Sequence, residues 1–286
     1  MDKMIGHTKT LESFINLYRN NHLPNKILLN GKKGIGKSLL VNSFLFNIYS
    51  DKNSKNLILS NTHPNIFRVS KNIDKKSIEI SQVRDLIRFQ HSTSFNNCTK
   101  TIIIDDLEFL NINTANALLK SLEEPNQNVI FFLINNIEYK ILETIKSRCI
   151  EYKLKLSENE IISIVNNYFN QDIYNQLSFD FINYYNTPSY IINLIKYFNE
   201  NNLNFKDISI EKFLLHIVKS KDFKSNSFIN ENLNYFIELF FYKNIKLKNI
   251  SYKLKDYFYY KFSDLKRYNL DMESYFLEFK EKLLRE

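Results

Sequence analysis

Three short, unbroken apolar runs in the first half of the chain predict buried β-strands. They occupy residues 27–30, 101–104 and 129–134. Runs without polar alternation are typical of parallel strands that are covered on both faces. Stretches with helical periodicity lie between and after them. This order predicts an α/β core over residues 1–150, with a parallel sheet flanked by helices.

The rest of the chain has the 3.6-residue periodicity of amphipathic helices. Apolar residues form one helical face over 161–169 and another over 190–198, and the polar run 199–202 is the expected linker. Residues 205–286 are helical in pattern throughout. In the last segment the apolar residues are Met272, Tyr275, Phe276, Phe279 and Leu283. We therefore predict a small helical segment at 151–204 and an all-α domain at 205–286.

Four consecutive aromatic residues stand within this last domain, at 257–260. One face of a helix cannot bury four neighbours in sequence, so some of these rings must face outward. We expect part of the group to lie in an interface with another subunit. The alternative is an ordinary bundle core.

Glycine is rare in the chain and is concentrated in one loop. Three of the four glycines, Gly31, Gly34 and Gly36, fall within six residues after the first predicted strand. With Lys37 and Ser38 they complete the pattern G-x-x-x-x-G-K-[ST] of a phosphate-binding loop. Backbone N–H groups of such a loop wrap the phosphates, and the following helix N-terminus adds a favourable dipole. The pattern predicts that Lys37 reaches the β- and γ-phosphates and that Ser38 ligates Mg²⁺; the alternative is a strand-to-helix turn without a ligand.

Polar residues follow the other two predicted strands. Asp105 and Asp106 end the second run, and Asn135 and Asn136 end the third. Parallel α/β sheets bind ligands at the carboxyl ends of their strands, where these side chains would adjoin the loop. We predict that Asp105 holds Mg²⁺ through water, that Asp106 orients or activates an attacking water, and that Asn136 touches the γ-phosphate or that water. The alternatives are an ordinary strand end and an Asx turn.

Two further segments complete a recognisable order of motifs. Residues 113–125 read N-T-A-N-A-L-L-K-S-L-E-E-P, and Pro125 is expected to stop a helix there. Residues 147–149 read S-R-C after the third strand. Together with the loop and the Asp-Asp strand, this order closely resembles the clamp-loader branch of the AAA+ ATPases over residues 1–150.

The resemblance implies a site, a ligand and partners. The core would be an AAA+ P-loop domain that binds ATP, followed by a helical lid at 151–204 and a collar at 205–286 that joins subunits. Arg148 would be an arginine finger that completes the ATP site of a neighbouring subunit. The implied partners are clamp-loader subunits of the gamma/tau and delta types and, through the complex, a sliding clamp and primed DNA.

The chain departs from this family at three places. Residues 45–63 contain no cysteine where many relatives have a zinc module, so we expect no zinc. Asp106 replaces the usual catalytic glutamate, and Tyr190 stands where motor subunits have an arginine. The segments at 62–64 (T-H-P) and 78–86 also favour a non-motor subunit. We expect a stator-like subunit with little ATP turnover; the alternatives are a gamma/tau-type motor and an unrelated P-loop protein.

Charge and composition narrow the setting of the protein. The net charge of +8 and the pI near 9.1 permit a nucleic-acid partner, but a Lys- and Asn-rich composition typical of an AT-rich genome explains them equally well. No apolar run approaches the length of a transmembrane helix, and the N-terminus lacks the apolar core of a signal peptide. Two cysteines, Cys98 and Cys149, cannot build a disulfide framework. We expect a cytoplasmic protein without membrane partners.

Overall fold

The computed structural model describes residues 5–49, 53–72, 74–124, 128–182, 187–247, 250–268 and 270–284. Pro125, the predicted end of a helix, lies outside these residues. The chain divides into two compact units. Unit 1 comprises Met1–Ile164 with Thr187–Ser189, and unit 2 comprises Val165–Asn186 with Tyr190–Glu286.

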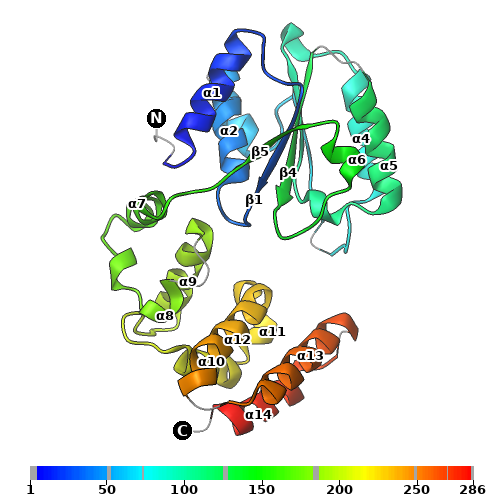
Figure 1. Ribbon diagram of the computed structural model, residues 1–286. Helices are drawn as coiled ribbons and strands as arrows, with labels where there is room; N and C mark the ends of the chain where they lie inside the picture. The colour runs from blue at the N-terminus through cyan, green and yellow to red at the C-terminus, as the bar shows by residue number, and fades with distance from the viewer. Residues whose placement is uncertain are drawn as a thin grey trace. The chain divides into compact units, whose positions relative to one another are not determined.

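Unit 1 contains a five-stranded sheet (Figure 1). Its strands are β1 (Lys26–Gly31), β2 (Ile66–Val69), β3 (Lys100–Ile104), β4 (Val129–Asn136) and β5 (Ile150–Lys153). They are ordered β2-β3-β4-β1-β5, and each neighbouring pair is parallel. The three predicted strands and the parallel sheet are therefore confirmed.

The two outer strands did not stand out as apolar runs. β2 includes Arg68, and β5 reads I-E-Y-K with exposed ends, because an edge strand has one neighbour and partial cover. β5 pairs with β1 and extends unit 1 beyond residue 150. The division of the chain at residues 150 and 204 stays a prediction.

The register of the sheet brings the predicted site residues to one edge. Gly31 at the end of β1 pairs with Asn136 at the end of β4. β3 pairs with β4 on its other side, and Asp105 follows directly after β3. The carboxyl ends of β1, β3 and β4 thus lie together, as predicted from the parallel pattern.

Helices cover both faces of this sheet (Figure 1). α1 and α2 lie on one face, and α4, α5 and α6 lie on the other, which confirms a parallel sheet flanked by helices. A further helix, α3, packs against α2. The helices are α1 (Thr8–Arg19), α2 (Lys37–Ile48), α3 (Ser54–Leu59), α4 (Ile80–His91), α5 (Ile112–Glu123) and α6 (Glu143–Lys146).

Alternate residues of β1 enter different cores. Ile27 and Leu29 belong to the core with Phe14 of α1 and Phe44 of α2. Leu28 belongs to the opposite core, with the buried faces of α4 and α5. Burying a side chain of this size contributes about 2 kcal/mol, so two filled cores hold β1 and the loop after it in place.

A buried lysine closes the end of α4. Lys100 on β3 is 3% exposed, and its Nζ donates to the carbonyl of Gln90 at 3.0 Å and to the carbonyls of Phe89 and Ser92. These carbonyls lie at the C-terminal end of the helix, where intrahelical donors run out and positive charge is favoured; the carbonyl of Phe89 also accepts the N–H and the hydroxyl of Ser92. The ammonium therefore satisfies the helix end from the sheet.

Replacing Lys100 with methionine is expected to lower the free energy of unfolding by about 2–4 kcal/mol, because three carbonyls at the end of α4 lose a charged donor, the one on Gln90 being buried. Lys120→Met, at an exposed position of α5, should change it by no more than about 0.5 kcal/mol. Urea denaturation of the two variants measures the difference. Equal stabilities would mean that water replaces the ammonium at no cost.

Unit 2 is helical, as predicted. Along the described residues, no helix is both long and apolar enough to cross a membrane. α7 (Glu158–Phe169) begins in unit 1 and ends in unit 2. Its further helices are α8 (Phe179–Ile182), α9 (Pro188–Glu200), α10 (Ile210–Ser220), α11 (Asp222–Ser225), α12 (Ser227–Leu247), α13 (Tyr252–Tyr268) and α14 (Met272–Leu283).

The predicted apolar face of the last helix is buried except for Met272, which is half-buried, and the four consecutive aromatic residues of α13 divide as expected. Tyr275, Phe276 and Phe279 of α14 are at most 1% exposed. Phe258 is buried among them, whereas Tyr260 is 74% exposed. The exposed rings of α13 are available for contact with another subunit, and that interface stays a prediction.

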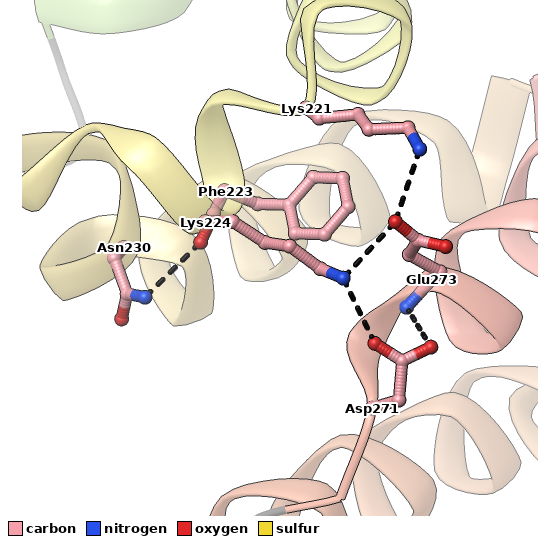
Figure 2. A network of polar contacts seen from close by, with 6 residues as sticks. All are labelled: Lys221, Phe223, Lys224, Asn230, Asp271 and Glu273. Carbon is pink, nitrogen blue, oxygen red and sulfur yellow. Dashed lines mark hydrogen bonds and ion pairs between the residues drawn. The ribbon is translucent and has the colours of Figure 1, made fainter.

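Charged side chains connect α11 to the start of α14 (Figure 2). Lys224 Nζ donates to Asp271 Oδ1 at 3.1 Å and to Glu273 Oε1 at 3.0 Å, and Lys221 Nζ donates to the same Glu273 oxygen at 3.0 Å. The hydrogen bonds from Lys224 lower the pKa of both carboxyls. Exposed pairs contribute little stability. We infer that these ion pairs position the start of α14, while the contact between the rings of Phe223 and Phe276 supplies the packing.

Candidate nucleotide-binding site

A cavity of about 380 Å³ lies at the carboxyl ends of β1, β3 and β4 in unit 1. The loop after β1, the turn after β3 and the end of β4 form its walls. The predicted site residues that line it are Gly34, Gly36, Lys37, Ser38, Asp105, Asp106 and Asn136. Sequence positions far apart are thus brought into one cavity.

Glycine is required at two positions of the loop. Gly34 has φ +80° and Gly36 has φ +101°, a left-handed backbone that other residues rarely adopt. A Cβ at Gly34 would lie 2.8 Å from the Cβ of Ser189 and 3.0 Å from Oγ1 of Thr187. The loop therefore packs closely against residues 187–189 and turns directly into α2, whose first N–H groups lack intrahelical partners.

Lys37 is the buried cation of the loop. Lys37 is the first residue of α2 and is 8% exposed. Its Nζ donates to the carbonyls of Gly31 at 2.7 Å and Lys32 at 2.8 Å. Burial lowers the pKa of Lys37 to about 8, and the carboxylate of Glu108 opposes that shift. An ammonium has three donors, so one remains for a phosphate oxygen.

Ser38 and Asp105 meet although they are far apart in sequence. The Ser38 hydroxyl donates to Asp105 Oδ2 at 2.9 Å. Arg68 of β2 lies beside them: its Nη2 donates to Asn42 Oδ1 at 2.6 Å, and its Nη1 is 4.0 Å from Asp105 Oδ2. The position of the carboxylate is thus set from α2 on one side and β2 on the other.

Two carboxylates follow Asp105: Asp106 comes directly after it, and Glu108 lies in the short 3₁₀ helix η2 (Leu107–Phe109). Asp106 has φ +56° and accepts a hydrogen bond from the N–H of Lys71. Burial, and then the charge of Asp105, raise the pKa of Asp106. Glu108 also lines the cavity, and its Oε2 accepts the N–H of Asn136 at 3.3 Å. Burial raises the pKa of Glu108 as well.

Asn136 carries an unsatisfied acceptor. Its side chain is 6% exposed, and its Oδ1 has no hydrogen-bond partner among the described residues. A buried polar atom without a partner is unusual and calls for a ligand or a water. Asn136 lines the cavity at the end of β4, and this oxygen is itself buried.

Arg148 lies apart from the cavity. It follows α6, its Nη1 donates to the carbonyl of Thr144 at 2.7 Å, and its Nη2 pairs with Glu123 Oε1 at 2.5 Å. Its side chain is 33% exposed. The guanidinium thus ends its own helix in this structure and does not line its own nucleotide site.

Tyr190 is packed inside unit 2. Its side chain is 8% exposed, and its ring lies 5.8 Å from the ring of Phe228 and 6.3 Å from that of Phe236. A buried phenol cannot replace an arginine as a cation for phosphate.

The sequence patterns missed three residues of the site. Glu108 lies two positions beyond the Asp-Asp pair, Arg68 stands in a weak strand pattern, and His7 precedes the first helix. His7 Nε2 is 3.0 Å from the carbonyl of Ile35, and burial lowers the pKa of the ring. Of these three residues, only Glu108 had a sequence signal: it is an acidic residue close after the end of a predicted strand.

The residues of the cavity fit a nucleoside triphosphate with a divalent cation. Lys37 and the N–H groups of α2 offer positive charge to phosphates. Ser38 and Asp105 offer oxygen ligands, which Mg²⁺ prefers. In the described part of the chain, no three His, Cys, Asp or Glu side chains form a metal site by themselves. A cation here would therefore be coordinated by phosphate oxygens as well as by protein side chains. The expectation that the chain binds no zinc stays a prediction.

Known proteins resemble this chain in its first half. The family model described as DNA polymerase III, delta subunit, matches residues 6–158. The delta' subunit of DNA polymerase III from Pseudomonas aeruginosa is 34% identical over 134 residues, which are 43% of this chain and 41% of that protein. The delta' subunit from Bacillus subtilis is 32% identical over 151 residues, or 49% and 45%. Subunit gamma from Buchnera aphidicola subsp. Schizaphis graminum is 28% identical over 171 residues, or 57% and 47%.

Each match spans less than half of the relative's length. The family match, by contrast, covers more than half of the 286 residues and includes the loop, Asp105, Asn136 and Arg148. It confirms the resemblance to the clamp-loader branch of the AAA+ ATPases. The chain belongs to the DNA polymerase III delta subunit family, and within it the chain is delta-prime-like.

Proposed function

We propose that this chain is a delta-prime-type clamp-loader subunit of DNA polymerase III. It binds ATP with Mg²⁺, without zinc, and turns ATP over slowly. It donates Arg148 to the ATP site of a neighbouring subunit. With gamma/tau and delta subunits as partners, it helps to load the sliding clamp onto primed DNA in the cytoplasm.

One observation carries this proposal: the chain has a complete phosphate-binding site and keeps its Ser-Arg-Cys arginine outside that site. A residue that acts on a neighbour's nucleotide must be reachable from outside its own fold. The side chain of Arg148 is partly exposed, and among the described residues it pairs with an exposed carboxylate and a helix-end carbonyl. These contacts are weak enough to exchange for a phosphate.

Each residue of the site has a role in this proposal. Lys37 would hold the β- and γ-phosphates, and Ser38 with Asp105 would hold Mg²⁺, which draws charge from the phosphate oxygens. Asn136 would touch the γ-phosphate or a water next to it. Asp106 is one methylene shorter than the glutamate of active relatives, and Tyr190 supplies no charge. These two positions support slow turnover.

A gamma/tau-type motor is the second candidate, because the loop is intact and every predicted loop residue reaches the cavity except Gly31, which precedes it. The two candidates differ in the rate of hydrolysis.

Single-turnover hydrolysis of ATP decides between them. We expect the pure chain to hydrolyse ATP far below ordinary enzyme rates of about 1–10³ s⁻¹. Addition of gamma/tau, delta, the clamp and primed DNA should produce rapid turnover. Rapid hydrolysis by the chain alone would establish the motor instead, and the absence of any assembly with these partners would contradict both candidates.

A further inference from the structure

A histidine side chain holds one peptide of the phosphate loop. His7 Nε2 lies 3.0 Å from the carbonyl oxygen of Ile35, and the contact is buried. A carbonyl oxygen can only accept, so Nε2 carries the hydrogen and donates it. The ring also packs beside Gly36, because a Cβ at that glycine would lie 3.9 Å from Cδ2 of His7. The imidazole therefore supports the loop at the residues that lead into α2.

The neighbouring carbonyls of the loop are held by backbone groups instead. The carbonyl of Gly34 accepts the N–H of Ser189 at 3.3 Å, and that of Gly36 accepts the N–H of Leu40 at 2.9 Å. Backbone donors remain after most substitutions. The carbonyl between these two is bonded by a side chain, so a single replacement of His7 releases one peptide of the loop.

The direction of this carbonyl sets the direction of an N–H group. The carbonyl of Ile35 and the N–H of Gly36 belong to one peptide, and in a trans peptide these two groups point in opposite directions. Gly36 lines the cavity, whereas His7 is not among the described residues that do. The carbonyl is directed at His7, so the N–H of Gly36 points the other way, where the loop borders the cavity. N–H groups turned in this manner are what a phosphate loop offers to an anion.

The backbone of His7 is itself fixed on both sides. Its carbonyl accepts the N–H of Leu11, in the first turn of α1, at 3.0 Å. The preceding Gly6 packs so closely that a Cβ there would lie 2.7 Å from Cδ2 of Leu156 and 3.1 Å from Cδ1 of Ile164. The ring is thus placed by α1 and by the segment after β5, independently of the loop that it supports.

We propose that His7 is a positioning residue of the nucleotide site: its Nε2–H holds the carbonyl of Ile35 and so directs the N–H of Gly36 at the phosphates. This role rests on the proposed binding of ATP at the cavity. Without the donor, a buried carbonyl loses its partner, and the peptide next to a glycine can turn. The ligand must then order the loop as it binds, which lowers its affinity.

His7→Phe and His7→Gln form the decisive pair. Phenylalanine keeps a flat ring and loses the donor, whereas the amide nitrogen of glutamine is as many bonds from Cβ as Nε2 of histidine. Both replacements meet the same left-handed backbone at position 7 (φ +53°), so its cost is shared. His7→Asn repeats the test if the phenylalanine variant does not fold, because asparagine tolerates this backbone and is too short to reach the carbonyl.

His63→Phe is the matched control. His63 is 7% exposed in unit 1, its Nδ1 accepts the N–H of Asn65 at 3.2 Å, and it is not among the described residues that line the cavity. Its replacement also removes a buried histidine, but far along the chain from the loop. Each full-length variant is titrated with ATP and, separately, with inorganic tripolyphosphate, both with Mg²⁺. The thermal midpoint is recorded without ligand.

We expect His7→Phe to weaken the binding of ATP and of tripolyphosphate by about 10-fold each, because the loss acts through the loop and not through the base. His7→Gln should stay within about threefold of the wild type. His63→Phe should lower the thermal midpoint and leave both affinities unchanged. Wild-type affinity in His7→Phe, or an equal loss in His7→Gln or in His63→Phe, would overturn the assignment.

The two ligands separate positioning from direct contact. A loss for ATP alone would mean that His7 touches the base or the ribose. A wild type that binds ATP but not tripolyphosphate would mean that the loop does not hold the phosphates. Either result contradicts the positioning role. A wild type that binds neither ligand would refute the proposed function as well, and the wild-type titration identifies that case before any variant is compared.

Discussion

Replacing Arg148 with alanine is expected to slow DNA-stimulated ATP turnover and clamp loading by the reconstituted complex, while this chain stays folded and binds its own nucleotide. The guanidinium would meet the γ-phosphate of ATP in the neighbouring subunit and stabilise charge in the transition state. Arginine fingers supplied in trans contribute roughly 10³–10⁵ in rate in other P-loop enzymes. Several sites share the work in a clamp loader, so the observed loss can be smaller.

The structure adds a condition to this prediction. Arg148 is held by Glu123 and by the carbonyl of Thr144, so it must exchange these partners for a phosphate. As a helix-ending residue alone it would contribute less than about 1 kcal/mol to stability. The alanine variant should therefore keep the thermal midpoint of the wild type within a few degrees.

Two further variants separate a finger from a surface charge. Arg148→Lys should rescue poorly, because an ammonium lacks the planar fork of a guanidinium. Arg88→Ala is the matched control: Arg88 is 81% exposed and pairs with Asp85 at 3.1 Å on the same unit. If Arg148→Ala assembles normally and the complex turns over at the wild-type rate, the role in trans is wrong.

Lys37→Ala is expected to abolish ATP binding by the isolated chain. The variant loses the one cation that is buried in the loop, and the carbonyls of Gly31 and Lys32 lose their donor. Loss of charge-assisted hydrogen bonds of this kind costs about 3 kcal/mol or more, which is roughly 100-fold or more in affinity. Isothermal titration with ATP and Mg²⁺ measures it. Lys32→Ala, an exposed lysine of the same loop, is the control and should bind normally.

The pH dependence of binding gives an independent check on Lys37. Because burial lowers its pKa to about 8, the ammonium loses its proton as pH rises through this value. Binding to phosphate needs the charged form, so affinity should fall by roughly tenfold between pH 7 and pH 9. Lys37→Ala should show no such dependence in any residual binding. Equal wild-type affinity at both pH values, or equal affinity of Lys37→Ala and the wild type, would mean that the loop does not use this cation.

The apolar patterns of the first half identified the central strands because those strands are buried on both faces. β1, β3 and β4 are unbroken apolar runs for this reason, and their polar ends marked the site at Asp105 and Asn136. The outer strands β2 and β5 were weak signals, because partial exposure at the edges admits Arg68 and the polar residues of β5.

Local sequence determined the elements whose chemistry is contained within a few residues: the glycine loop, the amphipathic helices and the buried strands. Only the tertiary structure decided which side chains meet. Ser38 bonds to Asp105, which is 67 positions away, and Glu108 bonds to Asn136, which is 28 positions away. Arg68 adjoins the carboxylate of Asp105. Strand order and a left-handed turn set these directions, and neither is encoded in the spacing of residues. A motif can therefore predict that a phosphate site exists, whereas the set of carboxylates that line it depends on how the strand ends are packed.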